Sequence, residues 1–286
     1  MILLQAHTKK QLDDLMAHPT HGVLLSGPEG SGKAHTARYL ASKLLGLNGV
    51  EKLATHPYFK EVSPVNGSLG IDHIRDLQKF LQLKTPGPKG IRRVILVENA
   101  HLMTTEAQNA LLKSLEEPPE DTVIILTAPA TQKLKETIYS RVQQITILPV
   151  PKQQALDSLK GDFSEADITK AFMMSSGHAG LLLALLQDTD HQLAQEILRA
   201  KEIIGSPRYE RLIRIDELAK QKEQLPLFLQ ACKLICSTAL HQAAQKQAAP
   251  QLKRWHSTLT ALYQAEAALP HNPNAKLLLT DLMLSL

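Results

Sequence analysis

Residues 24–45 read LLSGPEGSGKAHTARYLASKLL, and this stretch decides the fold. A short apolar run is followed by a glycine-rich loop and then by a segment of helical character, which is the context that a phosphate-binding loop requires. Glycines allow the backbone amides of such a loop to turn toward an anion, and the dipole of the following helix adds favourable potential. The candidate cofactor-binding residues of this loop are Gly27, Gly30, Ser31, Gly32, Lys33 and Ala34.

The last position of this loop departs from the GxxxxGK[ST] pattern. Lys33 is placed to reach the β- and γ-phosphates of a nucleotide, but the next residue, Ala34, has no hydroxyl group for Mg²⁺. Thr36 lies two residues further along the helix and therefore faces another direction. The loop thus predicts phosphate binding with a weakened or absent metal site.

A second motif lies in RRVILVENAHLM, residues 92–103. Four apolar residues, Val94–Val97, precede the pair Glu98–Asn99, where many P-loop ATPases have two acids. The first acid of such a pair holds Mg²⁺ through water and the second orients the attacking water. Asn99 cannot act as a base. Glu98 and Asn99 are candidate nucleotide-site residues, although a plain acid at the end of a strand is the alternative for Glu98.

The chain up to about residue 148 alternates short apolar runs with helical segments. Strands separated by helices indicate an α/β fold with a parallel sheet covered on both sides. We expect strands that are buried on both faces. The expected strands are 22–27, 61–65, 92–99, 121–129 and 143–148, and the expected helices are 8–17, 33–46, 70–83 and 104–117.

The rest of the chain is predicted to be helical. Short helices broken at KGDFS and SSGHAG are followed by longer ones, with Gly205–Pro207 and LPHNPN (269–274) as interruptions. The expected division is a P-loop domain over 1–148, a small helical domain over 149–189 and a helical C-terminal domain over 190–286.

Composition narrows the classes of function. The formal net charge is +4 and aromatic residues are only 4%, which argues against a stacking surface for single-stranded nucleic acid. The basic segment 84–93 is interpreted as a solvated loop, with a DNA-facing patch as the alternative. We find no signal peptide or membrane-spanning stretch and expect a cytoplasmic protein. Cys232 and Cys236 are expected to be small core residues.

Taken together, these motifs resemble the clamp-loader subunits of bacterial DNA polymerase III, in the AAA+ family, with the delta-prime group as the nearest. The resemblance covers residues 18–148 and weakens after residue 150. The run AQNALLKSLEEPP, residues 107–119, is much more specific for this group than the phosphate loop. The resemblance implies an AAA+ core with helical lid and collar domains, and a heteropentamer that loads a sliding clamp onto primed DNA. The implied partners are the gamma/tau and delta subunits, with no membrane.

The resemblance also implies a role for one arginine. The family's Ser-Arg-Cys motif is present as Ser140-Arg141-Val142. In that family the arginine reaches the γ-phosphate of ATP held by a neighbouring subunit, so Arg141 is a candidate catalytic residue in trans. The alternative is a surface arginine with no such partner.

Other departures from the family bear on nucleotide and metal. The family's zinc module is expected to be absent because residues 46–70 contain no cysteine. One alignment places Thr127 at the position of the polar residue that senses nucleotide in the family. Another alignment places Ala128 there, so that the polar residue is lost. His178 and Ala179 stand where catalytic members have an arginine. We therefore expect ATP or ADP to bind weakly or not at all, Mg²⁺ binding to be lost, and little or no ATPase activity; the alternative is an active gamma/tau-like ATPase.

The C-terminal helices are expected to form the collar that holds subunits together. Their apolar stripe comprises Leu225, Leu227, Leu229, Cys232, Ile235, Cys236 and Leu240. Its width suggests contact with a neighbouring subunit, and packing within its own domain is the alternative.

Overall fold

The computed structural model describes the whole chain except residues 1, 66, 87–89, 130–133, 188–191 and 272. Residue contacts divide it into two compact units: residues 1–158 with 178–180, and residues 159–177 with 181–286. The three-part division expected from the sequence stays a prediction, and its second boundary, 189–190, lies outside the described residues.

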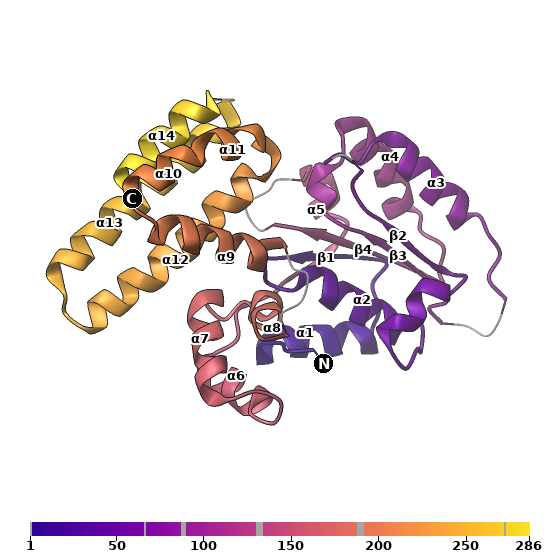
Figure 1. The fold of residues 1–286 in the computed structure, drawn as a ribbon. Helices are drawn as coiled ribbons and strands as arrows, with labels where there is room; N and C mark the ends of the chain where they lie inside the picture. The colour runs from indigo at the N-terminus through magenta and orange to yellow at the C-terminus, as the bar shows by residue number, and fades with distance from the viewer. Residues whose placement is uncertain (1, 66, 87–89, 130–133, 188–191, 272) are drawn as a thin grey trace. The chain divides into compact units, whose positions relative to one another are not determined.

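A five-stranded parallel sheet forms the centre of the first unit (Figure 1), as the alternation of strands and helices predicted. The strand order is β2-β3-β4-β1-β5, so the chain crosses over between strands that are not adjacent. Parallel strands need such crossovers, and helices supply them. The strands are β1 (Gly22–Ser26), β2 (Phe59–Val62), β3 (Arg93–Val97), β4 (Thr122–Ala128) and β5 (Gln143–Thr146).

The two edge strands correct the expectation that every strand is buried on both faces. In β5, the side chains of Gln143, Gln144 and Thr146 are exposed. In β2, residues 59–61 are half-buried and Val62 alone is buried. The strand order explains this difference, because β2 and β5 each have a neighbour on one side only. Strand β2 also lies earlier than the expected 61–65, since it pairs with Val94–Val97 and ends before Pro64.

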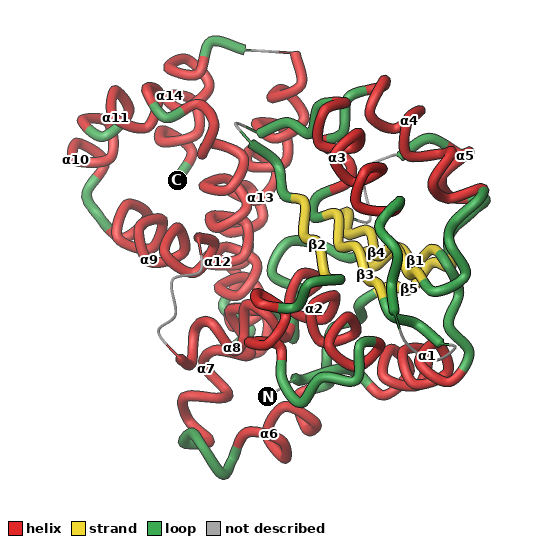
Figure 2. The backbone as a smooth tube through the Cα atoms, turned by 90° about the vertical axis from the view of Figure 1, so that its right-hand side faces the viewer, coloured by secondary structure: helices red, strands yellow, loops and turns green. Residues whose placement is uncertain are grey.

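Helices cover both faces of this sheet. Figure 2 shows α1 and α2 on one side of the strands and α3, α4 and α5 on the other. Alternation along each strand explains this layering: Val94 and Leu96 pack on one face, Ile95 and Val97 on the other. The helices of this unit are α1 (Ala6–Ala17), α2 (Lys33–Leu44), α3 (Ile71–Leu81), α4 (Thr105–Glu116), α5 (Glu136–Tyr139) and most of α6 (Lys152–Leu159), with short 3₁₀ turns η1 (Val50–Thr55) and η2 (Ala100–Leu102).

The second unit is helical. Local signals fix several helix starts: Ser164 accepts a hydrogen bond from the backbone N–H of Asp167, and Asn274 caps the last helix in the same way. The helices are α7 (Glu165–Ser175), α8 (Ala179–Gln187), α9 (Gln192–Gly205), α10 (Arg208–Ile213), α11 (Ile215–Lys220), η3 (Lys222–Gln224), α12 (Leu225–Gln245), α13 (Ala249–Ala268), η4 (Leu269–His271) and α14 (Ala275–Ser285).

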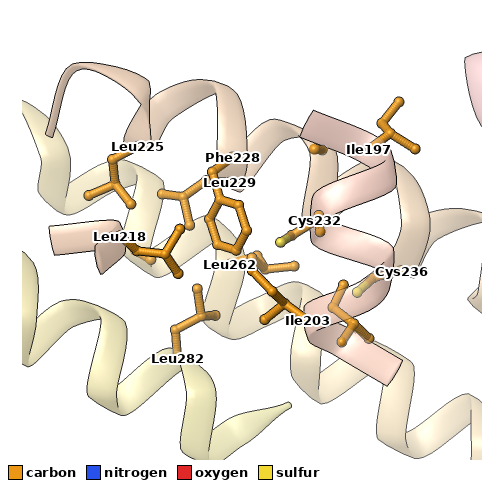
Figure 3. Close-up of a cluster of buried hydrophobic side chains, with 14 of the residues drawn as sticks. Ile197, Ile203, Leu218, Leu225, Phe228, Leu229, Cys232, Cys236, Leu262 and Leu282 are labelled. Carbon is orange, nitrogen blue, oxygen red and sulfur yellow. The ribbon is translucent and has the colours of Figure 1, made fainter. Parts of the chain in front are cut away.

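The apolar stripe of α12 packs largely inside its own unit (Figure 3). Leu225, Leu229, Cys232 and Cys236 are buried, which confirms the two cysteines as core residues. Burial raises the pKa of Cys236 to about 12, so this thiol stays protonated at neutral pH. The exposed apolar side chains of the last helix are different ones, Leu277 and Leu284. Among the described helices, none combines the length and apolar character needed to cross a membrane.

Candidate functional site

The predicted phosphate loop connects the carboxyl end of β1 to the start of α2. Gly30 has φ +79° and Gly32 has φ +89°, a left-handed backbone that glycine adopts without strain. Gly32 is also the residue that precedes the first turn of α2. The loop is therefore shaped as the sequence predicts, with the positive end of a helix dipole beneath it.

Lys33 is buried within this loop. Its side chain is only 7% exposed, and its Nζ donates a hydrogen bond to the carbonyl of Pro28 over 2.8 Å. Burial lowers the pKa of Lys33, and the nearby carboxylate of Glu29 offsets part of that effect. In this structure the ammonium is thus satisfied by the loop itself.

The position after Lys33 brings no metal ligand. Ala34 is half-buried and carries no hydroxyl, while Thr36 is 2% exposed and its backbone N–H donates to Gly32 within the helix. A buried Thr36 on a different side of α2 does not replace the missing hydroxyl.

Glu98, at the end of β3, is held by two neighbours. Arg38 of α2 donates to Oε1 over 2.8 Å, and Ser63 donates to Oε2 over 3.1 Å. Arg38 also bonds to Glu61 at 2.5 Å, so one guanidinium joins two carboxylates. Burial raises the pKa of Glu98, and the charge of Arg38 opposes that rise.

The groups around Glu98 do not form a ligand set that suits Mg²⁺. Both oxygens of Glu98 already have partners, and Mg²⁺ needs carboxylate, hydroxyl and water ligands in near-octahedral geometry. In the described part of the chain, no group of three or more His, Cys, Asp and Glu side chains could hold a metal ion. The expectations for zinc and magnesium stay predictions.

Asn99 contributes its backbone rather than its side chain to this region. It adopts a left-handed conformation with φ 49°, which asparagine tolerates better than most residues. Its N–H donates to the hydroxyl of Thr127 over 3.0 Å. Of the two sensor candidates, Thr127 is the one whose polar side chain meets the end of β3. The alignment that favours Ala128 depends on residues 132–134, of which 132 and 133 lie outside the described residues.

Two histidines lie near the loop: His178, which the sequence placed where catalytic members have an arginine, and His101, which the sequence analysis did not single out. His101 follows β3, and His178 directly precedes α8 and belongs to the first unit. Burial lowers the pKa of both imidazoles, and the charge of Lys33 lowers each further. The sequence signal that could have identified His101 is its place three residues after Glu98.

Arg141 lies at the other end of β1 from the phosphate loop. Its carbonyl oxygen packs against Gly22, the first residue of β1, whereas the loop follows Ser26, the last. Four residue steps of about 3.3 Å each separate the two ends of this strand by roughly 13 Å. The side chain of Arg141 is 34% exposed, and its guanidinium forms an ion pair with Glu116 at 2.7 Å. The structure therefore separates Arg141 from the other candidate site residues.

The basic segment 84–93 is partly internal. Arg93 is 1% exposed, and its guanidinium donates to the carbonyl of Leu81, the last residue of α3, and to that of Leu83 just beyond it. Arg92 pairs with Asp121. These two arginines tie the segment to the domain, which corrects the interpretation of the whole segment as a solvated loop; residues 87–89 lie outside the described part.

Comparison with known proteins agrees with this architecture. A solved structure of a DNA polymerase III gamma subunit-related protein from Thermotoga maritima matches 97% of both chains with a TM-score of 0.56 at 20% identity. The phosphate loop, the parallel sheet and the following helices define a P-loop protein of the AAA+ type.

The family follows from the sequence match. A family profile described as "DNA polymerase III, delta subunit" matches residues 4–151, and the chain belongs to that family. DNA polymerase III subunit delta' of Haemophilus influenzae is 30% identical over 65% of this chain and 61% of its own length. The same subunit of Pseudomonas aeruginosa is 39% identical over 46% of this chain and 45% of its own length. The aligned region thus spans about half of these relatives.

Proposed function

We propose that this chain is a delta-prime-like clamp-loader subunit that lends Arg141 to a neighbouring subunit and hydrolyses little or no ATP itself. The single observation that carries the proposal is the position of Arg141 at the opposite end of β1 from the chain's own loop. An arginine so placed cannot act on a phosphate bound to Gly30–Lys33 of the same chain. Its partial exposure leaves it available to a site on another subunit.

The chain's own loop supports a non-catalytic role. Ala34 has no hydroxyl, Asn99 replaces an acid, and Glu98 is engaged by Arg38. A hydrolytic P-loop site needs the hydroxyl and the acid for Mg²⁺ and a group that orients water. We expect ATP or ADP binding to be weak and independent of Mg²⁺.

The proposed partners are the gamma/tau and delta subunits of a loader for a sliding clamp on primed DNA. The family membership supports such an assembly. We place the collar contact on the exposed apolar side chains of the C-terminal helices.

The test is the ATPase rate of the reconstituted loader with Arg141→Ala in this subunit. We expect normal assembly with a DNA-stimulated rate that falls, up to about 10³-fold if this arginine limits turnover. Arg75→Ala is the matched control, since Arg75 is an exposed arginine of the same unit. An unchanged rate would refute the role of Arg141. Mg²⁺-dependent hydrolysis by the isolated chain, abolished by Lys33→Ala, would instead support the gamma/tau-like alternative.

A further inference from the structure

The first residues of α8 lie directly against the phosphate loop. A Cβ atom built on Gly180 would lie 2.7 Å from the backbone nitrogen of Gly32, 2.8 Å from its Cα and 2.9 Å from the carbonyl oxygen of Gly30. These are backbone atoms that cannot swing aside as a flexible side chain can. Glycine is therefore the only residue that fits at position 180 in this arrangement.

This contact lies within the first unit. Residues 178–180 group with residues 1–158, apart from the rest of α8. The loop amides that would face a phosphate group are those at Gly32 and the start of α2, and Gly180 packs on the first of them. The chain's own backbone thus covers the anion-binding face of the loop.

The covered region holds polar atoms without partners. Ser31 is 2% exposed, and its Oγ has no hydrogen-bond partner among the described residues. The Nδ1 atoms of His101 and His178 are likewise buried and unpartnered within the described chain. Buried polar groups are nearly always satisfied, so three orphans around one loop need an explanation.

Lys33 and Glu29 are opposite charges at the loop. Burial, and then the positive charge of Lys33, lower the pKa of both histidines. The carboxylate of Glu29 partly offsets burial by raising the pKa of Lys33 and of His101. The amino ends of α2 and α8 both meet at this point, and each contributes a positive dipole end. Orphaned polar groups and converging positive potential are the surroundings that suit an anion.

We propose that residues 178–180 are a cover over a retained phosphate-binding site, and that displacing the cover lets the loop take a phosphate group. This inference rests on the proposed function, because it assumes that the phosphate loop no longer takes part in ATP hydrolysis. The ligand is recognised through Ser31, Lys33 and the loop amides, so nucleotide phosphates and free pyrophosphate share the same chemistry. A cover closed about 99% of the time would weaken apparent affinity about a hundredfold.

The decisive variant is Gly180→Val in the full chain. Its side chain cannot fit against Gly30 and Gly32, so the cover is forced off the loop. Gly161→Val is the matched control, because a Cβ at Gly161 would meet no atom within 4 Å. Binding of pyrophosphate and of ATP, both without metal, is measured by isothermal titration calorimetry, and circular dichroism checks folding.

We expect Gly180→Val to bind pyrophosphate at least about tenfold more tightly than the wild type and Gly161→Val, and Lys33→Ala to remove that gain. Tighter binding of ATP than of pyrophosphate would identify a nucleotide as the source of the phosphate, and equal binding would identify the free anion. Equal affinities of a folded Gly180→Val and the wild type would overturn the proposal.

A measurement on the wild type covers the case in which Gly180→Val does not fold. Hydrogen exchange with mass spectrometry compares residues 28–36 and 174–182 with and without excess pyrophosphate. We expect slower exchange in the loop and faster exchange in the displaced cover. Absence of both changes overturns the proposal. Neither result bears on Arg141, so failure here leaves the in-trans role to its own test.

Discussion

Arg141 and Glu116 form an ion pair of 2.7 Å at the end of the sheet opposite the phosphate loop. Arg141 also donates to the carbonyl of Thr137 over 3.0 Å, so its guanidinium is oriented by α5 as well as by the end of α4. The run SLEEPP that made the family recognisable thus supplies the carboxylate that holds the proposed inter-subunit arginine. An ATP phosphate on a neighbour must compete with Glu116 for it.

The first prediction follows from this competition. Glu116→Gln removes the carboxylate charge, and we expect the ATPase rate of the assembled loader to rise about two- to fivefold. The reason is that a half-exposed ion pair of this kind contributes only about 0.2–1 kcal/mol. Glu117→Gln, at the neighbouring exposed acid, is the control. A fall in rate as large as that of Arg141→Ala would show instead that Glu116 positions the arginine.

A second prediction concerns repair of the chain's own site. The double variant Ala34→Thr with Asn99→Glu restores both motif residues, yet we expect no measurable Mg²⁺-dependent hydrolysis by the isolated chain. Glu98 remains paired with Arg38, and the segment at Gly180 still covers the loop. Colorimetric release of phosphate measures the rate. Turnover of the order of one per second would show that the two motif residues alone account for the loss.

The same double variant has a structural cost. Glutamate at position 99 must adopt the left-handed backbone of Asn99, which costs about 1–2 kcal/mol for most residues. We expect the midpoint of urea unfolding to fall for Asn99→Glu and to remain near the wild-type value for Ala34→Thr. An unchanged midpoint in Asn99→Glu would mean that the loop relaxes around the new residue.

The third prediction is a dependence of stability on pH. Burial, and then the charge of Lys33, lower the pKa of His178 in the folded chain. Below about pH 6.5 the unfolded chain therefore binds a proton that the folded chain does not, and the free energy of unfolding falls as the pH drops. His101 acts in the same direction, with Glu29 opposing.

Urea unfolding at pH 7.5 and pH 5.5 measures this effect. We expect His178→Gln to lose less stability on acidification than the wild type, whereas His18→Gln, at an exposed histidine, behaves as the wild type. Identical losses in all three chains would show that His178 does not titrate differently on folding.

Local sequence signals located most of the fold, and long-range contacts account for what they missed. The loop, β3 and α4 lie where the sequence predicted because apolar runs, glycines and Pro118–Pro119 mark their ends locally. The sequence placed strand β2 too late in the chain, because the position of this strand depends on its pairing with Val94–Val97 rather than on its own composition. The pattern of an α/β parallel sheet followed by helices was confirmed.

In the candidate site as well, local motifs identified single residues, whereas contacts between distant residues could not be predicted. The sequence identified Lys33, Glu98 and Asn99 from their motifs. It could not show that Arg38 donates a hydrogen bond to the carboxylate of Glu98, or that the hydroxyl of Thr127 accepts one from the backbone N–H of Asn99. The approach of Gly180 to Gly32 joins residues 148 positions apart in sequence, and no periodicity encodes such a contact.

The last prediction separates core from collar in the second unit. Phe228 is 1% exposed within the helical core, so Phe228→Ala should cost about 3–5 kcal/mol of stability. Leu277 is 69% exposed on α14, and Leu277→Asp should change stability by less than about 0.5 kcal/mol. If the exposed apolar side chains of α14 meet another subunit, this variant should instead weaken assembly, because a buried unpaired charge is costly.

Size-exclusion chromatography with the other loader subunits measures that assembly. Leu83→Asp is the matched control, since Leu83 is a 53% exposed leucine in the first unit. We expect Leu277→Asp to elute apart from the complex and Leu83→Asp to elute within it. Full co-elution of Leu277→Asp would place the collar contact elsewhere. The next positions to test would be the other exposed large apolar residues described in this unit: Leu198, Tyr209, Ile213, Tyr263 and Leu284.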